Sequence, residues 1–111
     1  MNLTPETNST TGIQGDPIAL TCMSTGGFPR QSVDWYRGST TGSVLTNCMV
    51  QHAYVQTLYN VNKSCTITPT NDGETFFCVT SYSDAPQLVD IAEVTLRLES
   101  MFTLFYVFNS M

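Results

Sequence analysis

The sequence predicts an all-β fold in which two antiparallel sheets pack as a sandwich, and three observations predict it. Short segments of alternating apolar and polar residues recur along the 111 residues, and clusters of Gly, Pro, Asn and Asp separate them. No segment of useful length has the period of a helix. Cys22, Trp35 and Cys78 fall in three different segments, and the two cysteines are 56 positions apart (78 − 22).

The strand boundaries follow from the period of two and from the turn residues. The segment 44–52 is expected to be one continuous strand, with Val44 and Cys48 on the same side. Residues 83–87 are expected to form a loop before the last strand. The predicted strands cover residues 18–23, 32–36, 44–52, 58–67, 76–81 and 93–99.

Length and composition limit the classes of function. A chain of 111 residues has the size of one domain. Its formal charge is −5, and its four Lys and Arg residues are scattered. This argues against nucleic acid and anionic membranes as partners, because both bind clustered positive charge. Four cysteines, an even number, fit two disulfides in an oxidising compartment.

Three N-glycosylation sequons also indicate an extracellular location. Asn2, Asn8 and Asn62 each stand two positions before a Ser or Thr. Met1 is followed by polar residues rather than by the apolar core of a signal peptide. We therefore expect a mature extracellular domain, either on a cell surface or secreted, with Met1 added for expression.

Two segments of different character flank the predicted domain, which covers residues 13–100. Residues 1–12 are polar and are expected to form a loose arm or an edge strand. The apolar tail at 101–111 is shorter than the roughly 20 residues that span a bilayer. It is interpreted as a short strand, a truncated membrane anchor or non-native sequence, with an incomplete or atypical C-terminus preferred. Exposed, such a tail favours self-association.

The spacing of Cys22, Trp35 and Cys78, with Asp72 and Phe76 before the second cysteine, resembles the immunoglobulin superfamily. The resemblance implies that the two sulfurs join the facing sheets and that the indole packs on the bridge. The gap between the cysteines is shorter than in variable-type domains, and the last strand lacks their Phe-Gly-x-Gly bulge. The implied fold is therefore an immunoglobulin-like antiparallel sandwich of constant type.

Within that set, the Gly-Gly-Phe-Pro stretch at 26–29 is similar to the membrane-proximal domains of butyrophilins and T-cell co-stimulatory ligands. The resemblance covers about residues 13–99 and implies a cis peptide between Phe28 and Pro29. Phe76 departs from the superfamily pattern, because the usual residue is a tyrosine whose hydroxyl bonds back to the backbone.

Cys48 and Cys65 are a second departure from the pattern. If their segments form a hairpin with its turn between Ala53 and Thr57, the two cysteines lie opposite each other. A disulfide then requires β-carbons about 3.8 Å apart. The alternative is a pair of buried free thiols in place of core aliphatics. The disulfide is the preferred interpretation, and co-stimulatory receptors, which also carry a second bridge, are a secondary resemblance.

No enzymatic chemistry is predicted. Ser43, Asp34 and the single histidine, His52, supply the residue types of a hydrolase, but nothing places them in a nucleophile elbow or beside an oxyanion hole. No His and Cys spacing fits zinc, and the carboxylates form no calcium loop. The glycine pair at 26–27 belongs to a turn. We therefore expect neither a metal nor a cofactor.

Tyr36, Phe77 and Val79 are the candidate partner-binding residues. They alternate with inward-facing Trp35 and Cys78, so they are expected side by side on the outer face of one sheet. Three apolar groups on a solvent face indicate an interface. The alternative is that the tail or a neighbouring domain covers them, and self-association through this face or the tail is a further expectation.

The resemblance implies an extracellular recognition or spacer domain of an immune cell-surface protein, which acts by binding an immune receptor or ligand. Two other interpretations stay open. One is a secreted or viral decoy that binds a host immune protein. The other is an antigen-presentation-type subunit that pairs with a heavy chain. A membrane anchor in a longer parent protein is compatible with the first interpretation.

Overall fold

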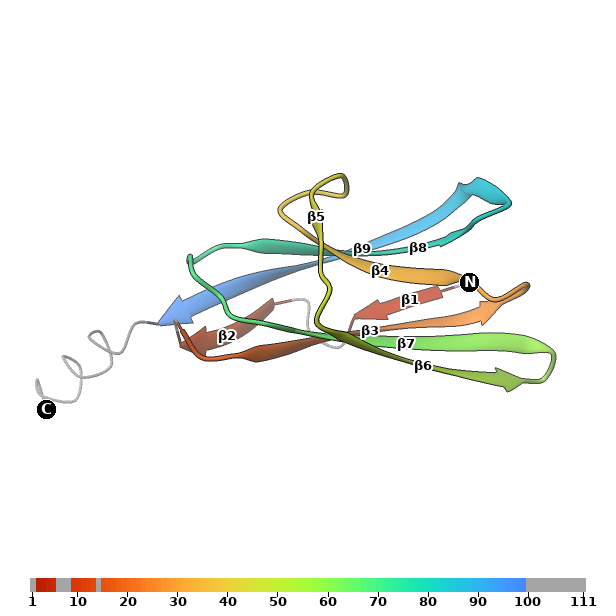
Figure 1. Ribbon diagram of the computed structural model, residues 1–111, viewed down its shortest axis with the longest axis horizontal. Coiled ribbons are helices and arrows are strands. Elements are labelled where there is room, and N and C mark those ends of the chain that lie inside the picture. The colour runs from red at the N-terminus through yellow and green to blue at the C-terminus, as the bar shows by residue number, and fades with distance from the viewer. Residues whose placement is uncertain (1, 6–8, 14, 100–111) are drawn as a thin grey trace, which may run out of the picture.

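The computed structural model describes residues 2–5, 9–13 and 15–99, and every regular element in these residues is a β-strand. The strands form two sheets that lie one over the other (Figure 1). The strands are β1 (Asn2–Pro5), β2 (Ser9–Ile13), β3 (Ile18–Gly27), β4 (Ser32–Arg37), β5 (Ser43–Val44), β6 (Cys48–Val55), β7 (Leu58–Ile67), β8 (Thr75–Tyr82) and β9 (Ala85–Glu99).

The four-stranded sheet has the order β1-β3-β7-β6, and the five-stranded sheet has the order β2-β9-β8-β4-β5. The pairs are antiparallel apart from β2 with β9, which is parallel. The predicted immunoglobulin-like sandwich of constant type is thus confirmed, with this one parallel pair as a difference. β5 has only two residues and is followed by β6 in the other sheet, so the additional long strands of a variable-type domain do not form between β4 and β6.

The prediction of one continuous strand at 44–52 is wrong. The backbone N–H of Leu45 donates to the carbonyl of Trp35 at 2.8 Å, whereas the carbonyl of Asn47 accepts from the N–H of Thr66 at 2.9 Å. These two bonds go to opposite sheets. The chain therefore changes sheet within residues 45–47, and the period of two on either side does not reveal this change.

The expected loop at 83–87 is also too long. β8 and β9 form a hairpin in which Tyr82 is opposite Ala85, so that only Ser83 and Asp84 form the turn. Pro86 lies inside β9 and did not end the strand. Residues 86–88 have no partner in β8, because the pairing shifts from Tyr82 with Ala85 to Ser81 with Val89, and a proline is tolerated at such an irregularity.

The core lies between the sheets and consists of the inward residues of both. Trp35, Phe76, Leu20 and Leu96 are fully buried. The predicted cis peptide between Phe28 and Pro29 is confirmed. β1 and β2 are edge strands, one in each sheet, as one of the two expectations for residues 1–12 had it. The apolar tail at 101–111 lies outside the described residues. The buried core residues are Leu20, Cys22, Val33, Trp35, Val61, Cys65, Ile67, Phe76, Cys78, Val94 and Leu96.

Candidate partner-binding face

The outer face of the five-stranded sheet brings the three predicted candidate residues together. Tyr36 on β4 lies directly opposite Phe77 on β8. Val79 lies two positions along β8 from Phe77, on the same face. All three side chains are half-buried, so each presents part of its apolar surface to solvent. We call this surface the outer five-strand face.

Three further apolar residues extend this surface, and the sequence interpretation did not include them. Val44 on β5 is 46% exposed and pairs with Tyr36. Ile91 on β9 is 54% exposed and pairs with Val79, and Val89 is 40% exposed. They were missed because 44–52 was expected in one strand and because β9 was expected to begin after these residues. We define the apolar patch as Tyr36, Val44, Phe77, Val79, Val89 and Ile91.

Polar side chains border the apolar patch. Glu93 lies opposite Phe77 on one side, and Asp34 lies opposite Val79 on the other. The carboxylate of Asp34 accepts a bond from Lys63 Nζ at 3.0 Å. An apolar centre with a polar and charged rim is the usual anatomy of a protein–protein interface.

An ion pair stabilises one end of this face. The guanidinium of Arg37, at the end of β4, donates from Nε and the NH2 nitrogen to both carboxylate oxygens of Glu74, at 2.6 and 2.9 Å. These bonds lower the pKa of Glu74 to about 2 and raise the pKa of Arg37 above its usual value. Glu74 also accepts from the N–H and hydroxyl of Thr70. The pair therefore fixes the β7–β8 loop against β4.

Phe76 occupies the position of the usual tyrosine and is fully buried. The guanidinium carbon of Arg37 lies 5.4 Å from the centre of its ring, within the range of a cation–π contact. The aromatic ring thus keeps its place in the core, and Arg37 joins it to the ion pair with Glu74.

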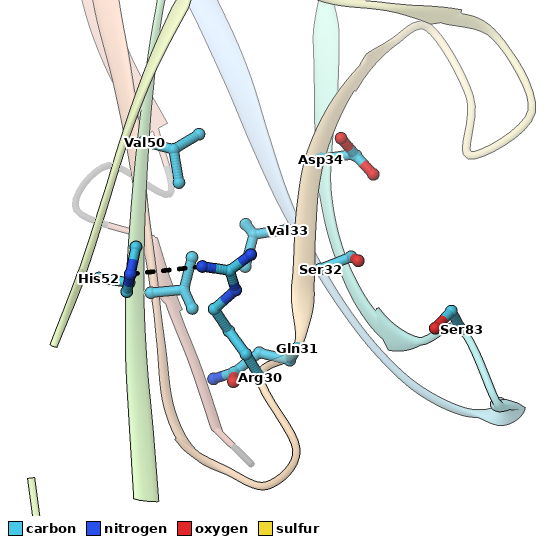
Figure 2. A pocket seen from close by; sticks show the side chains of 9 residues that line it. Arg30, Gln31, Ser32, Val33, Asp34, Val50, His52 and Ser83 are labelled. Carbon is cyan, nitrogen blue, oxygen red and sulfur yellow. Dashed lines mark hydrogen bonds between the residues drawn. The ribbon is translucent and has the colours of Figure 1, made fainter. Parts of the chain in front are cut away.

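A groove of about 610 Å³ opens beside β6, at the edge of the sandwich where β5 is short (Figure 2). Val50 and His52 line one side, and residues 30–34 line the other. Arg30 reaches across the groove, and its Nη1 donates to His52 Nε2 at 3.3 Å. The groove is therefore a concave surface with a cation inside it.

Ser43, Asp34 and His52, the three residue types of a hydrolase that the sequence contains, do not form a catalytic triad. Asp34 is bonded to Lys63 and His52 to Arg30, and Ser43 is not among the residues that line the groove with them. Over the described part of the chain, no group of three or more His, Cys, Asp or Glu side chains is placed to hold a metal ion. Within the same residues, no helix has the length and apolarity to cross a membrane.

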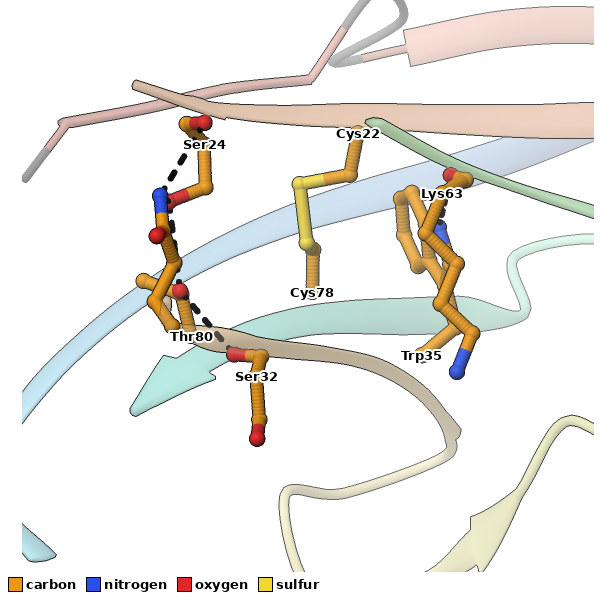
Figure 3. The surroundings of a disulfide bond; sticks show 8 residues. Cys22, Ser24, Ser32, Trp35, Lys63, Cys78 and Thr80 are labelled. Carbon is orange, nitrogen blue, oxygen red and sulfur yellow. Dashed lines mark hydrogen bonds between the residues drawn. A yellow bond between two sulfur atoms is a disulfide. The ribbon is translucent and has the colours of Figure 1, made fainter. Parts of the chain in front are cut away.

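Both cysteine pairs form disulfides. Cys22–Cys78 joins the two sheets, and Cys48–Cys65 joins β6 to β7 in the register expected from the hairpin. Figure 3 shows the inter-sheet bridge with Trp35 beside it, and the indole Nε1 donates to the carbonyl of Lys63 at 3.1 Å.

A buried polar chain runs beside the inter-sheet disulfide and was not predicted. Ser24 Oγ on β3 lies 3.2 Å from Thr80 Oγ1 on β8, and the Thr80 hydroxyl donates to the carbonyl of Ser32 at 3.0 Å (Figure 3). The amide of Gln31, which is 3% exposed, donates to Ser24 and to the carbonyl of Tyr59. Single polar residues inside a strand carry no pattern that separates a buried hydrogen bond from solvent exposure, so these residues could not be predicted as buried.

The structure describes one of the three sequons in full. Asn62 lies on the outer face of the four-stranded sheet, opposite Met23 and Gln51, and is half-buried. Its Oδ1 has no hydrogen-bond partner. Asn8 lies outside the described residues, and only the backbone of Asn2 is described. The glycans therefore stay a prediction.

Comparison with known families agrees with the fold: the chain is an immunoglobulin-like domain. The family profile described as the CD80-like C2-set immunoglobulin domain matches residues 2–87. This is more than half of the chain, and the chain belongs to that family. Immunoglobulin-like domains of this kind generally mediate protein–protein interactions. No curated protein sequence matches the chain.

Among solved structures, the chain is similar to the crystal structure of Rst D1-D2, with a TM-score of 0.71 and 19% sequence identity. The similarity covers 86% of this chain and 49% of the other, so the chain spans about half the length of that structure. Matching solved chains number 163. At this identity, and with so many matches, the similarity shows the fold and does not single out a function.

Proposed function

We propose that the chain is an extracellular recognition domain of an immune cell-surface protein of the co-stimulatory ligand or butyrophilin type. It binds a protein partner through the outer five-strand face. The observation that carries this proposal is the apolar patch, which spans four neighbouring strands of one sheet. Monomeric proteins seldom leave continuous apolar surface of this kind without a partner.

The fixed geometry of the patch supports the same function. The inter-sheet disulfide holds β8 at Cys78, between Phe77 and Val79. The ion pair of Arg37 and Glu74 holds the end of β4 next to Tyr36. Binding to this face therefore costs little conformational entropy, since its side chains lie on paired strands rather than on loops.

The covalent features favour the extracellular location. Two disulfides need an oxidising compartment to form and persist. Asn2, Asn8 and Asn62 are the proposed glycosylation sites. Intact mass of protein secreted from mammalian cells, before and after enzymatic deglycosylation, tests them, and an unchanged mass would rule the glycans out.

The binding test compares two arginine substitutions. Phe77→Arg puts a charge at the centre of the apolar patch, whereas Thr66→Arg puts the same charge on the exposed outer face of the other sheet. Tetramers of each variant, labelled with a fluorophore, are added to T cells and antigen-presenting cells. We expect Phe77→Arg to lower staining at least tenfold and Thr66→Arg to leave it unchanged.

The two variants also separate recognition from a spacer role. Melting temperatures of both variants establish that the fold is intact. Equal staining by both folded variants would remove the outer five-strand face as the binding site. No staining of any cell type by the unchanged domain would favour a spacer, which holds another domain away from the membrane.

A further inference from the structure

The free edge of β6 is the second surface that the structure leaves open. β6 is the last strand of the four-stranded sheet, and within the described residues no strand pairs with its other edge. Proteins usually protect such an edge with lysine, proline or a bulge. Residues 48–55 contain no Lys, Arg, Asp or Glu, no proline and no register shift against β7. The edge is thus eight residues long and unprotected.

The register identifies the backbone groups that point to this edge. Asn47 lies opposite Thr66 and accepts its N–H, so 47 and 66 are a hydrogen-bonded pair. In an antiparallel ladder such pairs alternate with non-bonded pairs. Cys48 and Cys65 are therefore a non-bonded pair. It follows that Val50, His52 and Tyr54 direct their N–H and C=O groups away from β7, toward the free edge.

The groove beside β6 adds a charge to this edge. The side chains of Val50 and His52 line the groove (Figure 2), and Arg30 lies 3.3 Å from the His52 ring. The carboxylate in the groove, Asp34, is already bonded to Lys63. Neither of the two ion pairs among the described residues includes Arg30. The groove therefore holds a positive charge on a chain whose formal charge is −5.

We propose that β6 receives an extended strand of another protein, and that this strand carries a carboxylate on the side that faces the groove. The strand completes the hydrogen bonds of Val50, His52 and Tyr54. Its residue opposite His52 lies about 5 Å away on the same face. A Glu or Asp at that position reaches the guanidinium of Arg30. The positive charge of Arg30 favours an acidic strand over the β6 strand of a second copy of this chain, because β6 contains no Asp or Glu.

The test uses two synthetic peptides and the full chain. One fluorescein-labelled peptide of nine residues alternates threonine and valine with glutamate at its centre, and the other has glutamine there. Fluorescence polarisation gives the Kd of each for the unchanged chain, for Arg30→Gln and for Arg97→Gln. Arg97 is exposed on β9 in the other sheet, so the last variant removes an equal charge at a distant site.

The expected result is a coupled loss. Glutamine in the peptide weakens binding at least tenfold, Arg30→Gln does the same, and the two changes together cost no more than one of them. Arg97→Gln leaves Kd within twofold. Equal affinity for the two peptides, absence of binding at millimolar peptide, or equal losses for Arg30→Gln and Arg97→Gln would overturn the proposal.

A proline substitution tests the edge itself. Val50→Pro removes an N–H that points to the free edge and leaves the β6–β7 hydrogen bonds in place. We therefore expect the variant to keep the melting temperature of the unchanged chain and to lose binding of both peptides. Unchanged binding by folded Val50→Pro would contradict strand addition. A dimer in sedimentation velocity that Val50→Pro dissolves would assign the edge to a second copy instead. Phe77→Arg should leave peptide binding unchanged, because it lies on the other sheet.

Discussion

Glu74 carries the largest electrostatic perturbation among the described residues, and its contacts explain it. The carboxylate accepts both donors of Arg37 and two groups of Thr70. These bonds favour the charged form and hold the pKa at about 2, against an ordinary value of 4.5. The pair ties the β7–β8 loop to the end of β4, so its loss is expected to loosen that end.

Substitution of Glu74 tests this role. Because the folded pKa lies below the unfolded one, the stabilisation is complete above about pH 5 and is lost as the pH falls toward 2. Glu74→Gln should lower the free energy of unfolding by roughly 1–3 kcal/mol at pH 7. The difference from the unchanged chain should shrink between pH 4.5 and 2.

Urea unfolding at pH 7, 4 and 2.5 measures this difference. Asp84→Asn is the control, because Asp84 is an exposed carboxylate in the β8–β9 turn. It should change stability by less than about 0.5 kcal/mol at each pH. A Glu74→Gln difference that stays constant with pH would show that the carboxylate contributes no pH-dependent stability.

At the scale of the strands, the two disulfides constrain different parts of the fold. Cys22–Cys78 joins positions 56 apart and crosses between the sheets, whereas Cys48–Cys65 joins positions 17 apart within one hairpin. In the chain-entropy account, a longer closed loop gives more stabilisation. The inter-sheet bridge also fills part of the core, which the hairpin bridge does to a lesser degree because Cys48 is only half-buried.

Removal of each pair separates these contributions. Replacing Cys48 and Cys65 by Ala should cost about 3 kcal/mol, and replacing Cys22 and Cys78 about 4 kcal/mol before any cavity cost. Hydrogen exchange should show faster exchange of the β6 amides in the first variant, with β8 unchanged. Faster exchange across both sheets would mean that the hairpin bridge supports the whole sandwich and not β6 alone.

The strand scale also shows what the sequence can predict. The alternation at 58–67 gave a strand with the bounds that the structure has. The pairing of Cys48 with Cys65 was also predicted, and the register of the hairpin places the two opposite each other. The turn itself is shorter than predicted: it was expected between Ala53 and Thr57, whereas β6 continues to Val55 and only Gln56 and Thr57 form the turn. The sheet change at 45–47 was not predictable, because it depends on Trp35 and Thr66, which are distant in sequence.

For the whole molecule, the sequence predicted the class of fold and part of the candidate site. Cys22, Trp35 and Cys78 specify the sandwich because they mark strands in both sheets. Tyr36, Phe77 and Val79 were predicted from alternation beside Trp35 and Cys78. Val44, Val89 and Ile91 join them only when β5 and β9 are placed beside β4 and β8. The order of strands in a sheet is a tertiary property, which local alternation does not encode.

Both outer faces of the sandwich expose apolar side chains, and the proposed glycan distinguishes them. The outer five-strand face carries the apolar patch, with three of its residues at least 40% exposed. The opposite face exposes Met23, Met49, Val55 and Leu58, but it also carries the half-buried sequon Asn62, and a glycan there would hinder a partner. We therefore propose the five-stranded sheet as the binding face, with the β6 edge as a separate proposed site.

The most direct test of the proposed binding face is a glycan placed on it. Ser81→Asn creates the sequon Asn-Tyr-Ser on β8 beside Val89 of the patch, and Ala19→Asn creates Asn-Leu-Thr on the exposed outer face of the four-stranded sheet. Both proteins are secreted from mammalian cells, checked for glycan occupancy by mass, and used as labelled tetramers on T cells and antigen-presenting cells. The account predicts that the glycan introduced by Ser81→Asn abolishes staining and that the glycan introduced by Ala19→Asn does not. Full staining by the glycosylated Ser81→Asn protein, or loss confined to Ala19→Asn, would contradict it.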